Sequence, residues 1–451
     1  MKIVVIGDGK VGHAITEHTC KEGHEVIVID KNAKVIEELV NLYDVGGICG
    51  NGASIEIQEN AGVSKADLVV AATSRDEVNM LACLIAKKLG AKATIARVRS
   101  YEYNSRIEQL KETLGIQMTI NPELEAANEI MNIINFPEAN RVDTFANGNV
   151  DLVELFIPEN SPLIGLSLAS ISSKYQVKIL VCAVQRGDEV FIPTGNFTFQ
   201  AKDKIHITAN RLDVKDFLKK LGLIETKIKD VLVIGGGKIS TYLAEELIKG
   251  KYNVKIIEKD YNRCLELSEL LPNASIIYGD GSDQLLLEEE GIDSCDAIVC
   301  LTNLDEENII ISLYAQKKEV TKIITKVNKS SFAGLVESIG VASVISPKDI
   351  TASRIISYVR ATSNIHGSNI IKLYKLVNNR VEAIEFVAKS NSKLLNKCLK
   401  DLKLKKNVLI ASIIRDSELI IPSGMSQIQS NDSVIVVTTT QLLDDLDDIL
   451  E

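Results

Sequence analysis

The sequence IVVIGDGKVG at residues 3–12 is repeated as VLVIGGGKIS at residues 231–240. An acidic residue follows at the same place in each copy, Asp30 in the first and Glu258 in the second. The match continues between GNG at residues 50–52 and GDG at 279–281, and between IPTG at 192–195 and IPSG at 421–424. The whole chain is therefore a tandem duplication, so a site in one half has a counterpart in the other.

The composition places the chain among soluble globular proteins. Its 451 residues are 45% hydrophobic and 25% charged, which suffices for several packed cores. No apolar run approaches the roughly 20 residues that cross a bilayer, and Met1 leads directly into the first strand without a signal sequence. The formal net charge of −10 argues against nucleic-acid binding, and eight cysteines without a C-x-x-C pair indicate reduced thiols rather than a metal site.

Short Val/Ile-rich runs alternate with longer segments of helical period at the start of each half. This alternation predicts a parallel, doubly wound α/β sheet of the Rossmann type. In the first half we expect strands at 2–6, 25–29, 45–49, 67–71, 93–98 and 117–120, and helices near 11–22, 32–42, 54–60, 75–89 and 101–114. The copy predicts strands near 230–234, 253–257, 275–277, 296–300, 322–327 and 343–345.

A long helix follows each Rossmann segment, and after it the sequence pattern changes. The helices are expected at 123–135 and 349–363, and each leads into about 85 residues of short strands joined by turns, which is typical of a small α+β module. We therefore expect six segments: a first Rossmann lobe (1–121), a linker (122–140), a first C-lobe (141–226), a second Rossmann lobe (227–347), a linker (348–366) and a second C-lobe (367–451).

In the small modules we expect strands at 152–157, 178–185, 189–192 and 204–209 with a helix near 167–173, and in the copy strands at 383–387, 408–415, 418–421 and 433–439. The long helices carry apolar faces, formed by Ile130, Ile133 and Ile134 in the first and by Ile355, Ile356 and Val359 in the second. Such faces are suited to contacts between chains. The alternative is that they pack only inside the chain.

The first strand-to-helix turn has the features of a dinucleotide site. Gly7 permits a tight turn, Gly9 lets the backbone approach a diphosphate, and Gly12 allows close packing of helix on strand. Asp30 ends the second strand, where a carboxylate accepts hydrogen bonds from both ribose hydroxyls and repels a 2′-phosphate. The pattern favours NAD over NADP but does not separate NAD from ATP or ADP, and a tight turn without a ligand is the weaker alternative.

The second copy of the motif is imperfect. Gly235, Gly237 and Glu258 match, but Ser240 replaces the third glycine, so a site there is expected to be looser, altered or empty. Two further loops fall at the carboxyl ends of the fourth strands, TSRDE at 73–77 and TNLDE at 302–306, and their hydroxyls suit ribose or phosphate. A helix N-cap explains those loops equally well. Arg97, and Lys326 in the copy, are phosphate ligands or solvated strand-end residues.

The expected nucleotide-binding residues come from the same places in both halves. In the first half they are Gly7, Asp8, Gly9, Lys10, Val11, Gly12, Asp30, Lys31, Asn51, Gly52, Thr73, Ser74, Asp76, Asn79 and Arg97. In the second half they are Gly235, Gly236, Gly237, Lys238, Ile239, Glu258, Lys259, Asp280, Gly281, Thr302, Asn303 and Lys326. We expect no catalytic and no metal-binding residues.

A dehydrogenase needs a general acid or base beside the nicotinamide, and the small modules offer none. His206 stands alone in an apolar strand, with Ile435 in the same place in the copy, and no nucleophile elbow or Walker lysine loop occurs. Nucleotide sensing without turnover is therefore favoured. An NAD-dependent oxidoreductase with unrecognised catalytic residues remains the alternative.

The segments GDGKVG at 7–12, GNGAS at 50–54, AATSRDEVNMLAC at 71–83 and ARVRS at 96–100 resemble the TrkA family of potassium uptake proteins. The resemblance covers essentially the full chain and implies two RCK units, each with a Rossmann lobe and a C-lobe. It implies a cytoplasmic ring of four chains, peripheral on the inner face of the cell membrane. The ring would dock on a TrkH-like integral-membrane potassium transporter and gate it according to bound NAD(H) or ATP/ADP.

Overall fold

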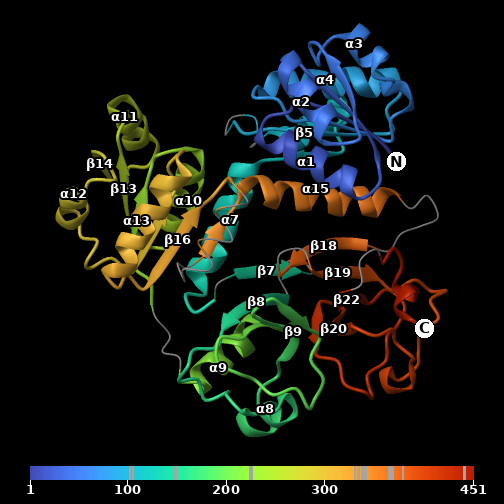
Figure 1. Ribbon diagram of the computed structural model, residues 1–451, viewed down its shortest axis with the longest axis vertical. Coiled ribbons are helices and arrows are strands. Elements are labelled where there is room, and N and C mark those ends of the chain that lie inside the picture. Colours follow the sequence, from blue (N-terminus) through green and yellow to red (C-terminus); the bar gives the residue numbers. More distant parts are fainter. Residues whose placement is uncertain are drawn as a thin grey trace. The chain divides into compact units, whose positions relative to one another are not determined.

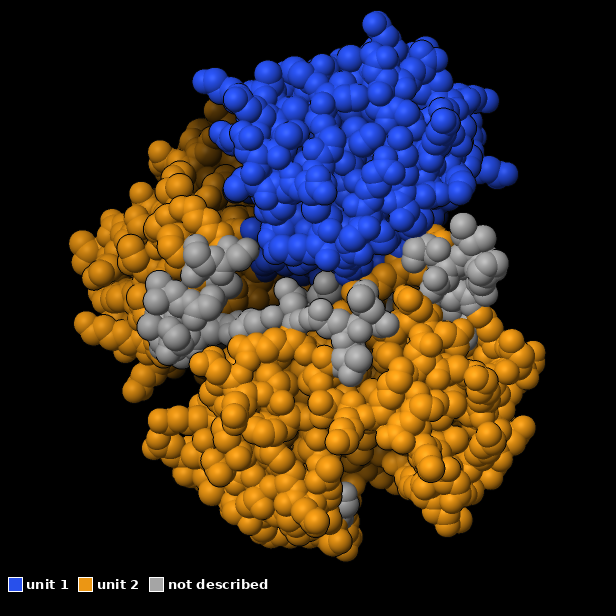
Figure 2. Space-filling model, turned by 45° about the vertical axis from the view of Figure 1, so that its right-hand side comes forward, with its two compact units in different colours: residues 1–126, 346–359 blue, residues 127–345, 360–451 orange. Residues whose placement is uncertain are grey.

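The computed structural model describes residues 1–100, 103, 106–139, 141–145, 150–222, 227–329, 332, 336, 343–363, 370–377, 380–439 and 443–451. The chain divides into two compact units, coloured separately in Figure 2. Unit 1 comprises Met1–Ala126 and Ser346–Val359, and unit 2 comprises Ala127–Ile345 and Arg360–Glu451. The first Rossmann lobe therefore belongs to one unit, and the second Rossmann lobe and both C-lobes belong to the other.

The first Rossmann lobe is a six-stranded parallel sheet in the order β3-β2-β1-β4-β5-β6, with helices between successive strands (Figure 1). The strands are β1 (Lys2–Ile6), β2 (Glu25–Asp30), β3 (Gly46–Cys49), β4 (Leu68–Ala71), β5 (Ala93–Arg97) and β6 (Met118–Ile120). The helical segments are α1 (Lys10–Lys21), α2 (Ala33–Leu42), α3 (Ile55–Asn60), η1 (Val63–Lys65), α4 (Asp76–Leu89) and α6 (Ile107–Leu114). The strand order changes direction between β1 and β4, which is where open α/β sheets bind ligands.

The second Rossmann lobe repeats this topology in the order β14-β13-β12-β15-β16-β17. Its strands are β12 (Asp230–Ile234), β13 (Asn253–Glu258), β14 (Ser275–Tyr278), β15 (Ala297–Cys300), β16 (Lys322–Lys326) and β17 (Ser343–Ile345). Its helices are α10 (Lys238–Lys249), α11 (Tyr261–Leu270), α12 (Gln284–Glu289) and α13 (Asp305–Lys317). The predicted fold class is confirmed, and the predicted strands of both lobes agree with the structure within two residues. Part of the helix expected at 101–114 (residues 101, 102, 104 and 105) lies outside the described residues.

The two C-lobes contain matching five-stranded antiparallel sheets. The first, in the order β10-β9-β11-β8-β7, is built from β7 (Arg141–Phe145), β8 (Val150–Phe156), β9 (Leu180–Arg186), β10 (Glu189–Phe191) and β11 (Lys204–Ala209), with α8 (Leu168–Tyr175) and α9 (Arg211–Lys220). The second, in the order β18-β19-β22-β20-β21, is built from β18 (Ile370–Leu376), β19 (Val381–Val387), β20 (Val408–Arg415), β21 (Glu418–Ile420) and β22 (Ser433–Thr438), with 3-10 turns η3 (Leu399–Asp401) and η4 (Leu446–Ile449). Strands β7 and β18 were not expected from the sequence.

The long helices are α7 (Pro122–Asn135) and α15 (Pro347–Ser363). Most of α15 lies in unit 1, where Ile355 and Val359 join the core of the first Rossmann lobe, and Arg354 forms an ion pair with Glu125 of α7. The apolar residues singled out on both helices are at most 1% exposed in a single chain: Ile130, Ile133, Ile134, Ile355, Ile356 and Val359. The expectation that these faces serve contacts between chains is therefore wrong, because the chain itself already buries them.

Within the described residues, no helix combines the length and the apolar character needed to cross a bilayer. The same part of the chain holds no cluster of three or more His, Cys, Asp or Glu side chains suited to a metal ion.

Candidate nucleotide site

The first glycine loop joins β1 to α1 and takes its shape from three glycines. Gly7 has a φ of +92°, which L side chains rarely adopt, and a Cβ there would lie 2.9 Å from Thr73. A Cβ on Gly12 would lie 1.9 Å from the carbonyl oxygen of Gly7, so helix and turn meet without space for a side chain. Gly9 differs from both. A Cβ there would meet nothing within 4 Å, which leaves open space over the loop where a diphosphate would approach.

Helix α1 begins directly after this open position. Gly9 is its N-cap, without a side-chain cap, and the amide groups of the first helical turn have no partner within the helix. Such amides bind phosphate groups, because the helix dipole adds a partial positive charge at the same end. Lys10 is exposed beside them, whereas the Val11 side chain is buried.

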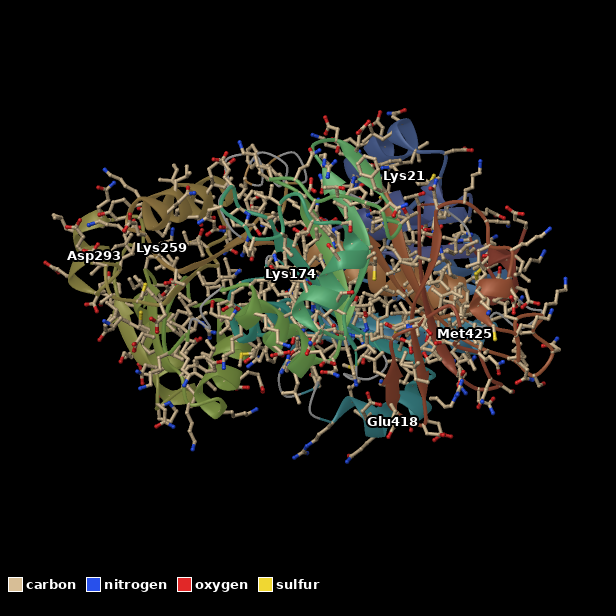
Figure 3. The ribbon with its side chains drawn as sticks, turned by 90° about the horizontal axis from the view of Figure 1, so that it is seen from below. Lys21, Lys174, Lys259, Asp293, Glu418 and Met425 are labelled. Atoms are coloured by element: carbon tan, nitrogen blue, oxygen red, sulfur yellow. The ribbon has the colours of Figure 1, made fainter. Side chains whose placement is uncertain are left out.

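The Asp30 carboxylate lies beside the loop, as expected. Its Oδ2 accepts a hydrogen bond from the Asp8 amide at 2.8 Å, and its Oδ1 accepts one from the Asn32 amide at 2.8 Å. Each carboxylate oxygen can accept a second hydrogen bond, so ribose hydroxyls can still be bound. Lys31 and its counterpart Lys259 are exposed, and Lys259 is labelled on the second Rossmann lobe in Figure 3.

The Asp8 side chain turns inward and forms a pair that sequence reasoning missed. Only 3% of the side chain is exposed, and its Oδ2 lies 3.2 Å from Nδ1 of His13 on α1. Burial raises the pKa of the Asp8 carboxyl, His13 opposes this rise, and Asp30 adds to it. The Asp8 amide therefore binds Asp30, and the Asp8 carboxyl lies buried beside the loop. Comparing the halves at an offset of 228 residues would have drawn attention to the pair, because Gly236 and Thr241 replace it.

The loop after β4 is held in place by Asn79. The side-chain oxygen of Asn79 accepts hydrogen bonds from the amide and hydroxyl of Thr73 at 2.9 and 2.6 Å, and its amide donates to the carbonyl oxygen of Arg97 at 2.9 Å. Asp76 is buried and accepts from the amides of Arg99 and Ser100 at 2.8 and 2.7 Å. These two side chains position the loop, whereas Ser74 is exposed at its tip.

Arg97 is neither a solvated residue nor directed into open space. Its Nη2 donates to the Glu123 carboxylate of α7 at 3.2 Å, and 14% of its side chain is exposed. Burial lowers the pKa of the guanidinium, and Glu123 opposes that change. Its counterpart Lys326 is also buried, and its Nζ donates to the carbonyl oxygen of Leu301 at 3.2 Å. The Arg97 and Lys326 side chains are therefore both largely buried at the carboxyl ends of their strands.

The second glycine loop has backbone angles close to those of the first. Gly235 has a φ of +96°, and Gly237 is the N-cap of α10 with φ −70° and ψ −174°, against −71° and −174° for Gly9. Ser240 is buried, and its hydroxyl donates to the carbonyl oxygen of Gly235, the counterpart of the carbonyl that Gly12 approaches. A Cβ on Gly237 would again meet nothing within 4 Å. The serine is thus accommodated, which removes the steric reason for expecting a looser second site.

Glu258 reproduces the contacts of Asp30. Its Oε2 accepts a hydrogen bond from the Gly236 amide at 2.6 Å, and its Oε1 accepts one from the Asp260 amide at 2.8 Å.

Arg263, which was not expected from the sequence, lies on the other side of Gly236. Arg263 of α11 donates from Nε to the Gly236 carbonyl oxygen at 2.8 Å and from Nη2 to the Thr241 hydroxyl at 2.9 Å. Its counterpart in the first half is Val35, and this difference at matched positions was the available signal.

The remaining candidates of the second half follow their counterparts. Asn308 holds the Thr302 loop as Asn79 holds the Thr73 loop, with Asn303 exposed at the tip. Gly52 and Gly281 lie against β1 and β12, where a Cβ would approach Ile6 and Ile234 to 2.0 and 2.3 Å. Asn51 and Asp280 are exposed beside them. Ser282 donates two hydrogen bonds to Asp280 at 2.9 and 2.7 Å, which lower the pKa of its carboxyl.

The comparisons with known proteins agree across the whole chain. The TrkA-N domain matches residues 3–122 and 231–347, and the TrkA-C domain matches residues 152–222 and 383–451. The chain is 33% identical to the Trk system potassium uptake protein TrkA homolog of Archaeoglobus fulgidus over 449 residues, which is 100% of both chains. It is 32% identical to the Trk system potassium uptake protein TrkA of Halomonas elongata over 442 residues, covering 97% of this chain and 95% of the relative.

Among solved structures, the chain is similar to the GsuK channel bound to NAD. The TM-score is 0.63 at 14% identity, covering 98% of this chain and 77% of the other. This likeness supports the fold alone.

Proposed function

Because this chain belongs to the TrkA family of potassium uptake proteins, whose members are regulatory and not enzymes, we propose that it gates a potassium transporter according to bound nucleotide. The chain would act in the cytoplasm, on the inner face of the membrane, as a ring of four copies docked on an integral-membrane potassium transporter. The proposed ligands are NAD(H) and ATP or ADP. The division into six segments and the assignment of the nucleotide-binding residues belong to the same proposal.

The observation that carries this proposal is the open first glycine loop beside Asp30. Gly7 and Gly12 bring β1 and α1 together so that the amides at the start of α1 face the space above Gly9. Asp30 provides carboxylate oxygens for a ribose within the same loop. A phosphate-binding helix end and a ribose-binding carboxylate are the two requirements of an adenine dinucleotide.

Gating needs a ligand that prefers one of two arrangements of an assembly. The loop is suited to this because its surroundings connect it to the rest of unit 1. Asn79 ties the loop after β4 to the end of β5, and Arg97 at that end is paired with Glu123 on α7. A nucleotide that shifts the β4 loop would therefore act on the helix that leads out of the lobe.

The test is copurification of the chain with its membrane transporter, followed by potassium flux in proteoliposomes with NADH, NAD+, ATP or ADP added. We expect copurification, and a flux that changes with at least one nucleotide. Gly9→Val in the same assay should remove the nucleotide response while leaving copurification intact, since its Cβ meets no protein atom. A flux that ignores all four nucleotides in the wild type would contradict the proposal.

A further inference from the structure

The two glycine loops differ in charge, although their backbone angles agree closely at the first and second glycines. The first loop is bordered by two carboxylates, Asp8 and Asp30, with His13 paired to Asp8. The second is bordered by one carboxylate, Glu258, and by the guanidinium of Arg263. A side chain at Gly236 would require the Leu267 side chain to move, because its Cβ would lie 2.4 Å from a terminal methyl group of Leu267. The second loop is therefore less negative by two formal charges.

Arg263 lies next to the part of the site where the ribose would bind. Glu258 accepts a hydrogen bond from the Gly236 amide, and Arg263 donates one to the Gly236 carbonyl oxygen. The two side chains therefore contact opposite ends of the same residue. From standard backbone dimensions, this keeps the carboxylate and the guanidinium within about 9 Å of each other. The carboxylate in this position binds the adenosine ribose, and an arginine nearby is the feature that accommodates a 2′-phosphate in dinucleotide sites.

The guanidinium is held in this position rather than extended into solvent. Besides Gly236 and Thr241, it contacts Glu266, whose Oε2 accepts from Nη1 at 2.8 Å. Side-chain exposure is 27% for Arg263 and 63% for Glu266, so the solvated Glu266 can release its hydrogen bond at little cost. Each Nη carries a second hydrogen, which leaves the fork suited to bidentate phosphate binding.

A pair of tyrosines lies at the same edge of the second sheet. Tyr278 is opposite Glu258 in the strand register, and Tyr261 begins α11 three residues after Glu258. Their ring centroids are 5.5 Å apart, and 59% of Tyr261 and 62% of Tyr278 are exposed. The first half has Ala33 and Cys49 at these positions. Exposed aromatic rings beside a ribose-binding carboxylate offer a stacking surface for a base.

We propose that the second Rossmann lobe binds an adenine dinucleotide with or without a 2′-phosphate, and that Arg263 is the residue that admits this phosphate. The first lobe, with Asp8 and Asp30, binds only the form with a free 2′-hydroxyl. This inference rests on the proposed function, because it assigns ligands to the same pair of nucleotide sites. The chain would thereby bind NADP only through its second half and NAD through both halves.

The experiment isolates each site in the intact chain. Gly9→Val closes the first loop and Gly237→Val closes the second, and neither Cβ contacts protein atoms, so both variants should fold. Each is titrated calorimetrically with NAD+ and with NADP+, which differ only in the 2′-phosphate. With Gly237→Val we expect NADP+ to bind at least about 30-fold more weakly than NAD+, and with Gly9→Val we expect the two affinities to agree within about threefold.

Arg263→Gln in the Gly9→Val background tests the role of the guanidinium. We expect the affinity for NADP+ to fall about tenfold or more and that for NAD+ to change less than about threefold. Tyr278→Cys in the same background is the matched control, and should weaken both nucleotides alike if the ring stacks on the base they share. A Tyr278→Cys variant that binds both nucleotides normally would overturn the stacking assignment.

Equal discrimination against NADP+ in the two isolated sites would overturn the inference, as would an Arg263→Gln variant that loses both nucleotides equally. If Gly9→Val binds neither nucleotide while Gly237→Val still binds NAD+, the second lobe has no dinucleotide site. The inference then fails and the proposed function stands. If neither isolated site binds NAD+ or NADP+, the inference also fails, and the flux assay with ATP and ADP then decides the proposed function.

Discussion

The glycine loop of the first Rossmann lobe lies beside Asp8, His13 and Asp30, whereas the matching loop of the second lobe lies beside Glu258 and Arg263. The C-lobes show no such divergence at their best-defined ion pair. Arg186 binds Asp203 through Nε and Nη2 at 2.7 and 2.8 Å, and Arg415 binds Asp432 in the same way at 2.9 and 2.7 Å. This ion pair is therefore the same in both C-lobes, whereas the groups around the proposed nucleotide differ between the two Rossmann lobes.

The largest expected effects should be equal in the two halves. Asp203 and Asp432 are at most 2% exposed. Each also accepts a hydrogen bond from a backbone amide, that of Gln200 and that of Gln429 respectively. Asp203→Ala and Asp432→Ala should each lower the free energy of unfolding by about 3 kcal/mol, since a buried carboxylate–guanidinium pair is broken. Urea titration of the intact chain measures this, with the exposed Lys202→Ala as the control. A clearly smaller loss for one lobe would break the equivalence.

The next effect should differ between the halves. Gly12→Ser places a Cβ 1.9 Å from the Gly7 carbonyl oxygen and should cost about 2 kcal/mol of stability, together with nucleotide binding in the first lobe. Ser240→Gly removes one hydrogen bond to Gly235 and should cost about 1 kcal/mol, with nucleotide binding in the second lobe retained. Calorimetric stoichiometry and thermal unfolding of both variants provide the measurement. If Gly12→Ser binds nucleotide normally, the first turn adapts as the second one has.

The carboxylates that hold the glycine loops should have similar effects in the two halves. Asp30 and Glu258 make the same pair of backbone hydrogen bonds, so Asp30→Ala and Glu258→Ala should each weaken NAD+ binding at their own site by about 1–2 kcal/mol. Titrations in the Gly237→Val and Gly9→Val backgrounds separate the two sites. In the second site, Glu258→Ala should leave the ratio of the NAD+ and NADP+ affinities unchanged, because Arg263 already offsets the charge of Glu258.

The smallest effect concerns pH and exists only in the first half. Burial raises the pKa of the Asp8 carboxyl above its value of 3.8 in an unfolded chain, so the folded state holds this proton more tightly. The charged form therefore destabilises the fold above the raised pKa, and this penalty disappears below pH 3.8. Asp8→Asn should stabilise the chain at pH 7 by less than about 1 kcal/mol, with the gain vanishing near pH 3.8. Urea titrations across this pH range test it, and a gain that grows on acidification would contradict the assignment.

Much of the architecture could be predicted from the sequence. The Val/Ile-rich runs, the glycine motifs and the repeat at a nearly constant offset predict two doubly wound sheets, since strand propensity and turn geometry are local properties. The positions of Gly7, Gly9 and Asp30 relative to one another also follow, because a strand, a tight turn and a helix leave few alternatives. The first strands of the C-lobes, β7 and β18, were missed, although each lies at a sheet edge and pairs with the strand that follows it in the chain.

Contacts between segments that are distant in sequence could be seen only in the tertiary structure. Ile355 and Val359 follow the second Rossmann segment in sequence, yet they complete the core of the first, which no local pattern encodes. The placement of Arg263 against Gly236 depends on the packing of α11 beside the loop, whereas the inward turn of Asp8 toward His13, on the helix that continues from the loop, places the carboxylate where it is buried. The sequence thus determined which backbone forms each nucleotide loop. Packing between distant segments determined the charges around it, because burial and hydrogen-bond partners exist only once the chain is folded.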